Sequence, residues 1–146
     1  MSIESFAKLV QFSISPIALI SGASLLLLSI TNRLGRTIDR SRTLVRELES
    51  KEPVRFRDLH KTQLRILLRR SGFLRAAVLS ISASIFLSAM MIVGVFLQVF
   101  AGWELKNEVL VCLFMSVLSV CAAVVYLALD VSAGLKALHL EIDRHI

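Results

Sequence analysis

Charged residues are absent from three long stretches of this chain, and apolar residues dominate each of them. The first stretch runs from Leu9 to Ile30, the second from Ala76 to Trp103, and the third from Val109 to Leu129. About 20 apolar residues, each rising about 1.5 Å, cross about 30 Å of hydrocarbon, and each stretch is long enough. A buried helix of a soluble domain would be nearer to about 10–14 residues. The pattern therefore predicts three transmembrane helices.

The overall composition agrees with a membrane protein. Hydrophobic residues make up 55% of the chain and charged residues 19%, against about 45–50% and about 25% in ordinary globular domains. We expect an all-α fold in a single membrane domain. Its predicted parts are spans near 9–31, 76–101 and 109–130, a helical hairpin near 32–75, and a tail over 131–146.

The distribution of charge predicts the orientation in the membrane. Between Thr31 and Arg75 lie 13 of the 17 lysines and arginines but only five acidic residues, so this stretch carries a net charge of +8. The opposite connection, from Ala101 to Glu108, contains one basic residue. Because basic loops stay in the cytoplasm, we expect a bacterial inner-membrane protein with its N-terminus outside and its C-terminus inside. Anionic lipid headgroups are the expected contacts of the basic loop.

The basic stretch has a helical rather than a linker-like pattern. Apolar residues recur at Leu34, Ile38, Val45 and Leu48, which gives steps of four and three residues if Ser41 is included. Such steps are typical of a coiled-coil seam. The sequence Ser50-Lys51-Glu52-Pro53 predicts a turn after it. We therefore expect a cytoplasmic hairpin whose arms continue the first two spans, and Pro16 is expected to mark the start of the first helix.

Small and polar residues follow one face of the first span and lead into arginines. Such a face can pack against another helix, or it can line a wet cavity between several subunits. The basic side chains that continue this face can fix topology or attract anions. The candidates for lining or gating a pore are Ser21, Gly22, Ser29, Asn32, Arg33, Arg36 and Arg40.

The other two spans carry stripes of their own. Ser80, Ser84 and Ser88 follow at four-residue intervals, the small-residue spacing that predicts close helix packing. The stripe of the third span comprises Cys112, Ser116, Ser119, Ala123, Tyr126 and Asp130.

Asp130 borders the third span, where a carboxylate needs a partner. We expect an ion pair with Arg33, Arg36 or Arg75, with Arg75 as the principal candidate, and leave ion coordination or gating open as its role.

Sequence motifs for catalysis are not found. No Gly-rich phosphate loop, zinc-protease motif or nucleophile elbow occurs, and the three histidines lack the spacing of metal ligands. We therefore expect no catalytic residues, no metal and no cofactor, and do not expect an enzyme. The basic stretch also lacks a recognisable nucleic-acid-binding module, so no nucleic-acid partner is expected.

Several segments resemble a known family. They are Ile14-Ser-Pro-Ile-Ala-Leu-Ile-Ser-Gly22, Leu-Leu-Ser-Ile-Thr-Asn-Arg-Leu-Gly-Arg over 27–36, Ile-Asp-Arg-Ser-Arg-Thr-Leu over 38–44, and Leu-Arg-Arg at 68–70. The chain resembles the small bacterial membrane proteins of domain-of-unknown-function family 2721. Asp130 stands where that family resemblance implies a glutamate. The resemblance implies a bacterial cytoplasmic-membrane location and no particular activity.

Three helices cannot enclose a pore by themselves, so we expect self-association. The first hypothesis is a homo-oligomeric ion channel or channel-like pore lined by the first helix. The alternative is a non-conducting scaffold or accessory subunit that binds partners through the basic hairpin.

Overall fold

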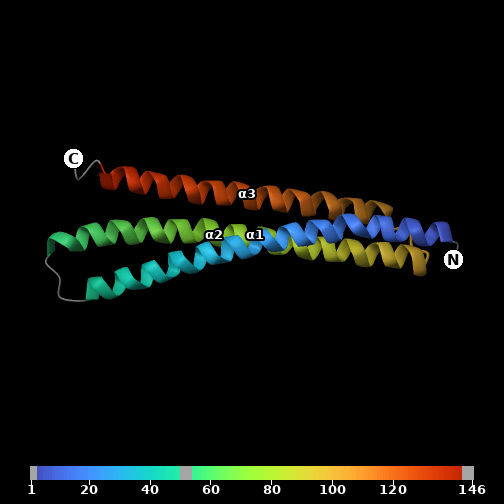
Figure 1. Ribbon diagram of the computed structural model, residues 1–146, viewed down its shortest axis with the longest axis horizontal. Helices are drawn as coiled ribbons and strands as arrows, with labels where there is room; N and C mark the ends of the chain where they lie inside the picture. The colour runs from blue at the N-terminus through green and yellow to red at the C-terminus, as the bar shows by residue number, and fades with distance from the viewer. Residues whose placement is uncertain (1–2, 50–53, 143–146) are drawn as a thin grey trace. The chain divides into compact units, whose positions relative to one another are not determined.

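The computed structural model of the chain describes residues 3–49 and 54–142, and the described part contains three long helices (Figure 1). Helix α1 spans Ile3–Glu49, α2 spans Val54–Phe100 and α3 spans Lys106–Ile142. All three are long and apolar enough to cross a membrane. The predicted all-α fold with three such helices is confirmed.

Each helix extends well beyond the apolar stretch it contains. Helices α1 and α2 have 47 residues each, which corresponds to about 70 Å at about 1.5 Å per residue. The basic segments after the first apolar stretch and before the second are therefore helical up to Glu49 and from Val54. The predicted turn at 50–53 and the last four residues of the predicted tail lie outside the described residues.

Pro16 does not start a helix. It lies inside α1, where its side chain is buried. A proline lacks the N–H that would bond to the preceding turn, but transmembrane helices tolerate this because neighbouring groups satisfy the freed carbonyl. The prediction of a helix N-terminus at this residue was therefore wrong.

A five-residue connection, 101–105, joins α2 to α3. Gly102 has a φ of 68°, in the left-handed region that residues with a Cβ rarely adopt. The N–H of Ala101 donates to the carbonyl of Leu97, and the N–H of Leu105 donates to the carbonyl of Trp103. These bonds close α2 and tighten the loop before α3 begins.

The chain forms two compact units. One contains α1 up to Leu28 with Leu79–Ala123, and the other contains Ser29–Val78 with α3 from Val124 onward. Each unit therefore holds a segment of all three helices, and each has its own buried residues.

Buried positions in the helices recur with a heptad period. In α1 they fall at seven-residue intervals, and in α2 they alternate at three and four residues. A period of 3.5 residues keeps one narrow seam facing the neighbouring helices, as in left-handed coiled coils. The buried positions are Pro16, Ala23, Ile30, Thr37 and Leu44 in α1, and Leu74, Ala77, Ile81, Ser84, Ser88 and Met91 in α2.

In the basic part of α1, the buried seam differs from the predicted one at two positions, and at each of them the buried residue is one position earlier in the sequence. Ile38 and Val45 are exposed, whereas Thr37 and Leu44 are buried. Thr37 can occupy the interior because its hydroxyl donates to the carbonyl of Arg33 at 3.0 Å, so no polar group is left unsatisfied.

Candidate functional site

The most unusual feature of the second unit is a fully buried carboxylate between two arginines. Asp130 has 0% exposure. Arg70 donates a hydrogen bond from Nε to Oδ1 of Asp130 at 2.9 Å. Arg33 approaches the other oxygen, with its Nη1 3.8 Å from Oδ2, which is an ion pair but too long for a hydrogen bond. The Oδ2 atom has no hydrogen-bond partner among the described residues.

Helix periodicity explains why these residues meet. Asp130 follows Ala123 by seven residues and therefore lies on the same buried face of α3. Arg70 precedes Leu74 by four residues and extends the α2 seam. Arg33 lies three residues beyond Ile30, at the edge of the buried face of α1.

The structure brings together only some of the residues predicted for this ion pair. Arg33 contacts Asp130 as the sequence suggested, but Arg36 and Arg75 are exposed. The principal candidate, Arg75, is replaced by Arg70, which sequence reasoning missed. Five residues separate the two arginines, which places them about 140° apart around α2. The signal for Arg70 was its position in the three-and-four spacing of the seam.

Gly134 provides the surface on which the Arg70 guanidinium rests. A Cβ added at Gly134 would lie 3.4 Å from Cζ of Arg70 and 3.6 Å from both Nη1 and Nη2. Three such similar distances place the glycine over the flat face of the guanidinium.

The first unit contains a buried cluster of three serine hydroxyls. Ser116 on α3 donates to the carbonyl oxygen of Ser84 on α2 at 2.9 Å. Its Oγ also lies 2.9 Å from Oγ of Ser84 and 2.7 Å from Oγ of Ser88. Because the single hydroxyl proton of Ser116 goes to the carbonyl, Ser84 and Ser88 must both donate to Ser116. All three protons are thus used, and the cluster joins α2 to α3.

The predicted packing stripe on α2 lies on its inner side. Ser84 and Ser88 are buried, and Ser80 is half-buried. The stripe predicted on α3 likewise faces inward, since Ser116, Ala123 and Asp130 are buried. The buried hydroxyl groups of these two stripes, those of Ser84, Ser88 and Ser116, are therefore satisfied within the chain.

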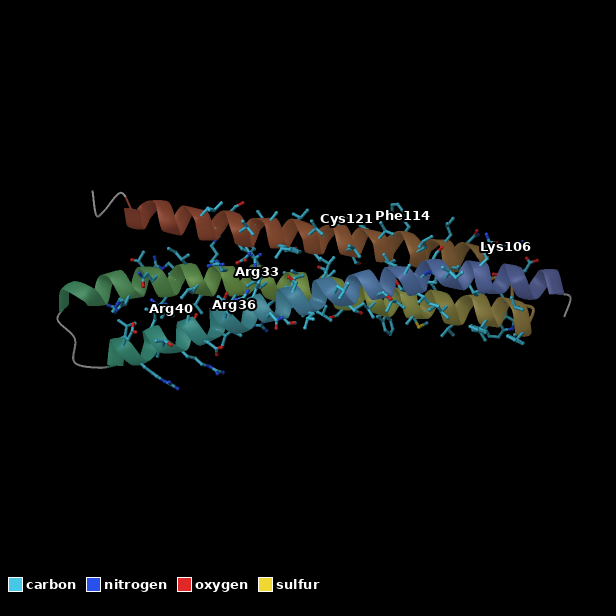
Figure 2. The ribbon with its side chains drawn as sticks, viewed as in Figure 1. Arg33, Arg36, Arg40, Lys106, Phe114 and Cys121 are labelled. Carbon is cyan, nitrogen blue, oxygen red and sulfur yellow. The ribbon has the colours of Figure 1, made fainter. Side chains whose placement is uncertain are left out.

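The stripe on α1 has the opposite environment. Ser21, Gly22, Ser29 and Asn32 are exposed, and a Cβ added at Gly22 would meet nothing within 4 Å. The arginines that continue the stripe follow one another along α1 in Figure 2. Arg36 and Arg40 are exposed, while Arg33 is the one that turns to Asp130. No contact in the described structure shows what faces this stripe.

Two further features have no part in these arrangements. Cys112 is half-buried, Cys121 is exposed, and both are free thiols. Among the described residues, no group of three His, Cys, Asp or Glu side chains is placed to hold a metal ion.

These observations define an all-helical protein with three membrane-capable helices, held together by buried polar contacts. Such a chain is compatible with a multi-pass membrane protein. It belongs to the family described as Protein of unknown function (DUF2721), whose model matches residues 13–140. Comparisons with curated proteins and with solved structures gave no match.

Proposed function

We propose that this protein spans the bacterial cytoplasmic membrane three times and self-assembles into a homo-oligomeric ion channel lined by α1. The observation that carries the proposal is the exposed polar stripe of α1. On α2 and α3, Ser84, Ser88 and Ser116 are buried and bonded to one another within the chain. On α1, by contrast, Ser21, Ser29 and Asn32 are exposed. Within hydrocarbon, such groups are expected to face other helices or water rather than lipid tails.

A second copy of the chain is the simplest cover for this stripe. Small residues allow two helices to approach closely, and hydroxyl and amide groups can bond across the interface or to water. Copies arranged in a ring with α1 innermost would enclose a polar conduit. A conduit of this kind needs several subunits, because each copy supplies only one narrow polar face.

The charge distribution supports an orientation for this assembly. Because basic loops stay in the cytoplasm, the proposal assigns the stretch with net charge +8 to a cytoplasmic helical hairpin and the N-terminus to the outside. Arg36 and Arg40 are exposed on α1 beyond the polar stripe. At the cytoplasmic mouth of a ring, their guanidinium groups would raise the local concentration of anions.

A non-conducting scaffold is the second candidate. Ala18 and Gly22 are exposed and small, so the stripe also suits dry helix packing without a water-filled centre. In that case the copies associate through α1 and the basic helical segments bind partner proteins. Neither candidate includes a catalytic step, a cofactor or a nucleic-acid partner.

Cysteine substitution in proteoliposomes distinguishes the two. With Cys112 and Cys121 replaced by alanine, the variants Ser21→Cys and Ser29→Cys are treated with a water-soluble, charged thiol reagent during an ion-flux measurement. The control is Phe114→Cys, an exposed apolar position on α3 (Figure 2). The channel proposal predicts flux that the reagent blocks at 21 and 29 but not at 114. Cysteines that cross-link between copies without any flux would favour the scaffold and overturn the channel.

A further inference from the structure

The Asp130 centre has an excess of positive charge. Two guanidinium groups, from Arg33 and Arg70, share the single carboxylate of Asp130. With all three side chains charged, the centre carries a net charge of +1. A group carrying one negative charge would make it neutral.

The arginines also have unused hydrogen-bond donors. In the described structure Arg70 uses only its Nε–H, and Arg33 makes no hydrogen bond through its guanidinium. The guanidinium of Arg70 lies with its flat face against Gly134. The arginine fork matches oxyanion geometry, and arginine–phosphate contacts are often bidentate.

The exposed fractions of the three side chains indicate which of them a ligand can contact. The side chains of Arg33 and Arg70 are 35% and 27% exposed, whereas that of Asp130 is 0% exposed. The two arginine side chains are therefore partly accessible from outside the chain, whereas the carboxylate is not. Arg33 has no hydrogen bond to lose, so it can turn outward while Arg70 holds Asp130. Oδ2, which lacks a hydrogen-bond partner, keeps Arg33 near by charge alone.

We propose that Arg33 and Arg70 bind one phosphate group, with Asp130 acting as the positioning residue that holds the two guanidinium groups together. The phosphate can belong to an anionic phospholipid or be free in solution. The inference rests on the membrane placement proposed above but not on conduction. Asp130 lies at the end of the third uncharged stretch, next to the basic side of the chain, where lipid phosphates are found.

The test is lipid titration of the full-length protein in neutral detergent, followed by native mass spectrometry. The probes are phosphatidylglycerol, phosphatidylcholine and, in a separate arm, inorganic phosphate. We expect one phosphatidylglycerol per chain to be retained in preference to phosphatidylcholine, whose choline cation offsets the phosphate charge. Saturable binding of inorganic phosphate without lipid retention would support the same site and assign it a soluble ligand.

Two charge-matched variants separate this site from general attraction to an anionic surface. Arg33→Gln and Arg36→Gln each remove one positive charge from α1, but only Arg33 faces Asp130. General attraction predicts a loss of about fivefold in affinity for both. The proposed site predicts a loss of at least about tenfold for Arg33→Gln and no more than about fivefold for Arg36→Gln. Equal losses, or no saturable binding of any probe to the wild type, would overturn it.

Failure here can be told apart from failure of the channel proposal. Flux that is blocked at Ser21→Cys, with equal lipid affinity in the two arginine variants, would leave the channel in place and remove the phosphate site. Saturable phosphate binding by a chain that gives no ion flux would leave the phosphate site in place and remove the channel. Arg33→Lys provides a folding-neutral check, because it keeps the charge but loses the fork that matches phosphate.

Discussion

Arg70 donates its Nε–H to Oδ1 of Asp130 at 2.9 Å, and among the described residues this is the only hydrogen bond to the buried carboxylate. The contact joins α2 to α3 at residues 60 positions apart in the chain. Arg33 of α1 adds a longer ion pair to the other oxygen. The three helices of the second unit are therefore tied together at one side chain, by contacts of unequal strength.

Because the two arginine contacts to Asp130 differ in length, substitutions of Arg70 and Arg33 should lower the free energy of unfolding by different amounts. Arg70→Gln leaves a buried carboxylate without its hydrogen bond and should lower the free energy of unfolding by about 3–5 kcal/mol. Arg33→Gln removes a long, partly exposed pair and should lower it by no more than about 1 kcal/mol. Unfolding in mixed detergent micelles measures both. A loss for Arg33→Gln as large as that for Arg70→Gln would contradict the geometry.

A double substitution checks that the loss comes from the stranded carboxylate. Replacing a buried ion pair by apolar residues of similar volume is often neutral. Arg70→Met combined with Asp130→Leu should therefore unfold at higher free energy than Arg70→Met alone. Additive losses in the double variant would mean that the two side chains act independently.

Ser116→Ala should be more damaging than a substitution of its neighbour on α3. Ser116 accepts from Ser84 and Ser88 and donates to the carbonyl of Ser84. Each such bond is worth about 0.6 kcal/mol on average in a membrane protein, so the expected loss is about 1–2 kcal/mol. The control is Ser119→Ala, which removes only a bond to the carbonyl of Met115 within α3 and should cost about 0.5 kcal/mol or less. The same micelle unfolding experiment measures the difference.

Helices α2 and α3 approach each other closely at Gly94. A Cβ added there would lie 2.9 Å from Cγ2 of Val109. Overpacking of this kind costs about 1–3 kcal/mol, and the higher helix propensity of alanine returns up to about 1 kcal/mol. Gly94→Ala should therefore destabilise the chain, and Val109→Ala should restore stability in the double variant. Thermal unfolding followed by circular dichroism tests this, and an unchanged melting temperature in Gly94→Ala would exclude the contact.

Gly22 separates packing within the chain from packing between chains. A Cβ at Gly22 or at Gly72 would meet nothing within 4 Å, so leucine at either position should leave the single chain folded. If α1 faces another copy, Gly22→Leu should shift the protein to smaller assemblies, while Gly72→Leu should not. Sedimentation in detergent measures the change. Equal behaviour of the two variants would place the interface elsewhere than the stripe.

The sequence was sufficient to predict the parts of the fold that depend on length and polarity. Three uncharged stretches of more than 20 residues predict three long helices, because a helix satisfies all of its backbone hydrogen bonds within one stretch. The four-residue spacing of Ser80, Ser84 and Ser88 likewise predicts an inner face, and the structure buries Ser84 and Ser88.

The rotation of each helix about its own axis was harder to predict, because either of two nearby residues can occupy a buried position. Ile38 is more apolar than Thr37, yet the threonine is buried, since its hydroxyl bonds to its own helix. Arg75 is nearest in sequence to the second apolar stretch, yet Arg70 meets Asp130 because it continues the spacing of Leu74 and Ala77. A 3.5-residue period carried backward from the serines would have identified Arg70.

The most direct test of the account is to count the subunits of the wild-type protein by native mass spectrometry in lipid nanodiscs. The channel proposal predicts a closed assembly of four or more copies, which gives the exposed α1 stripe enough neighbours to surround a central conduit. A monomer or a dimer would contradict it, because three or six helices with one narrow polar stripe per copy cannot enclose such a path.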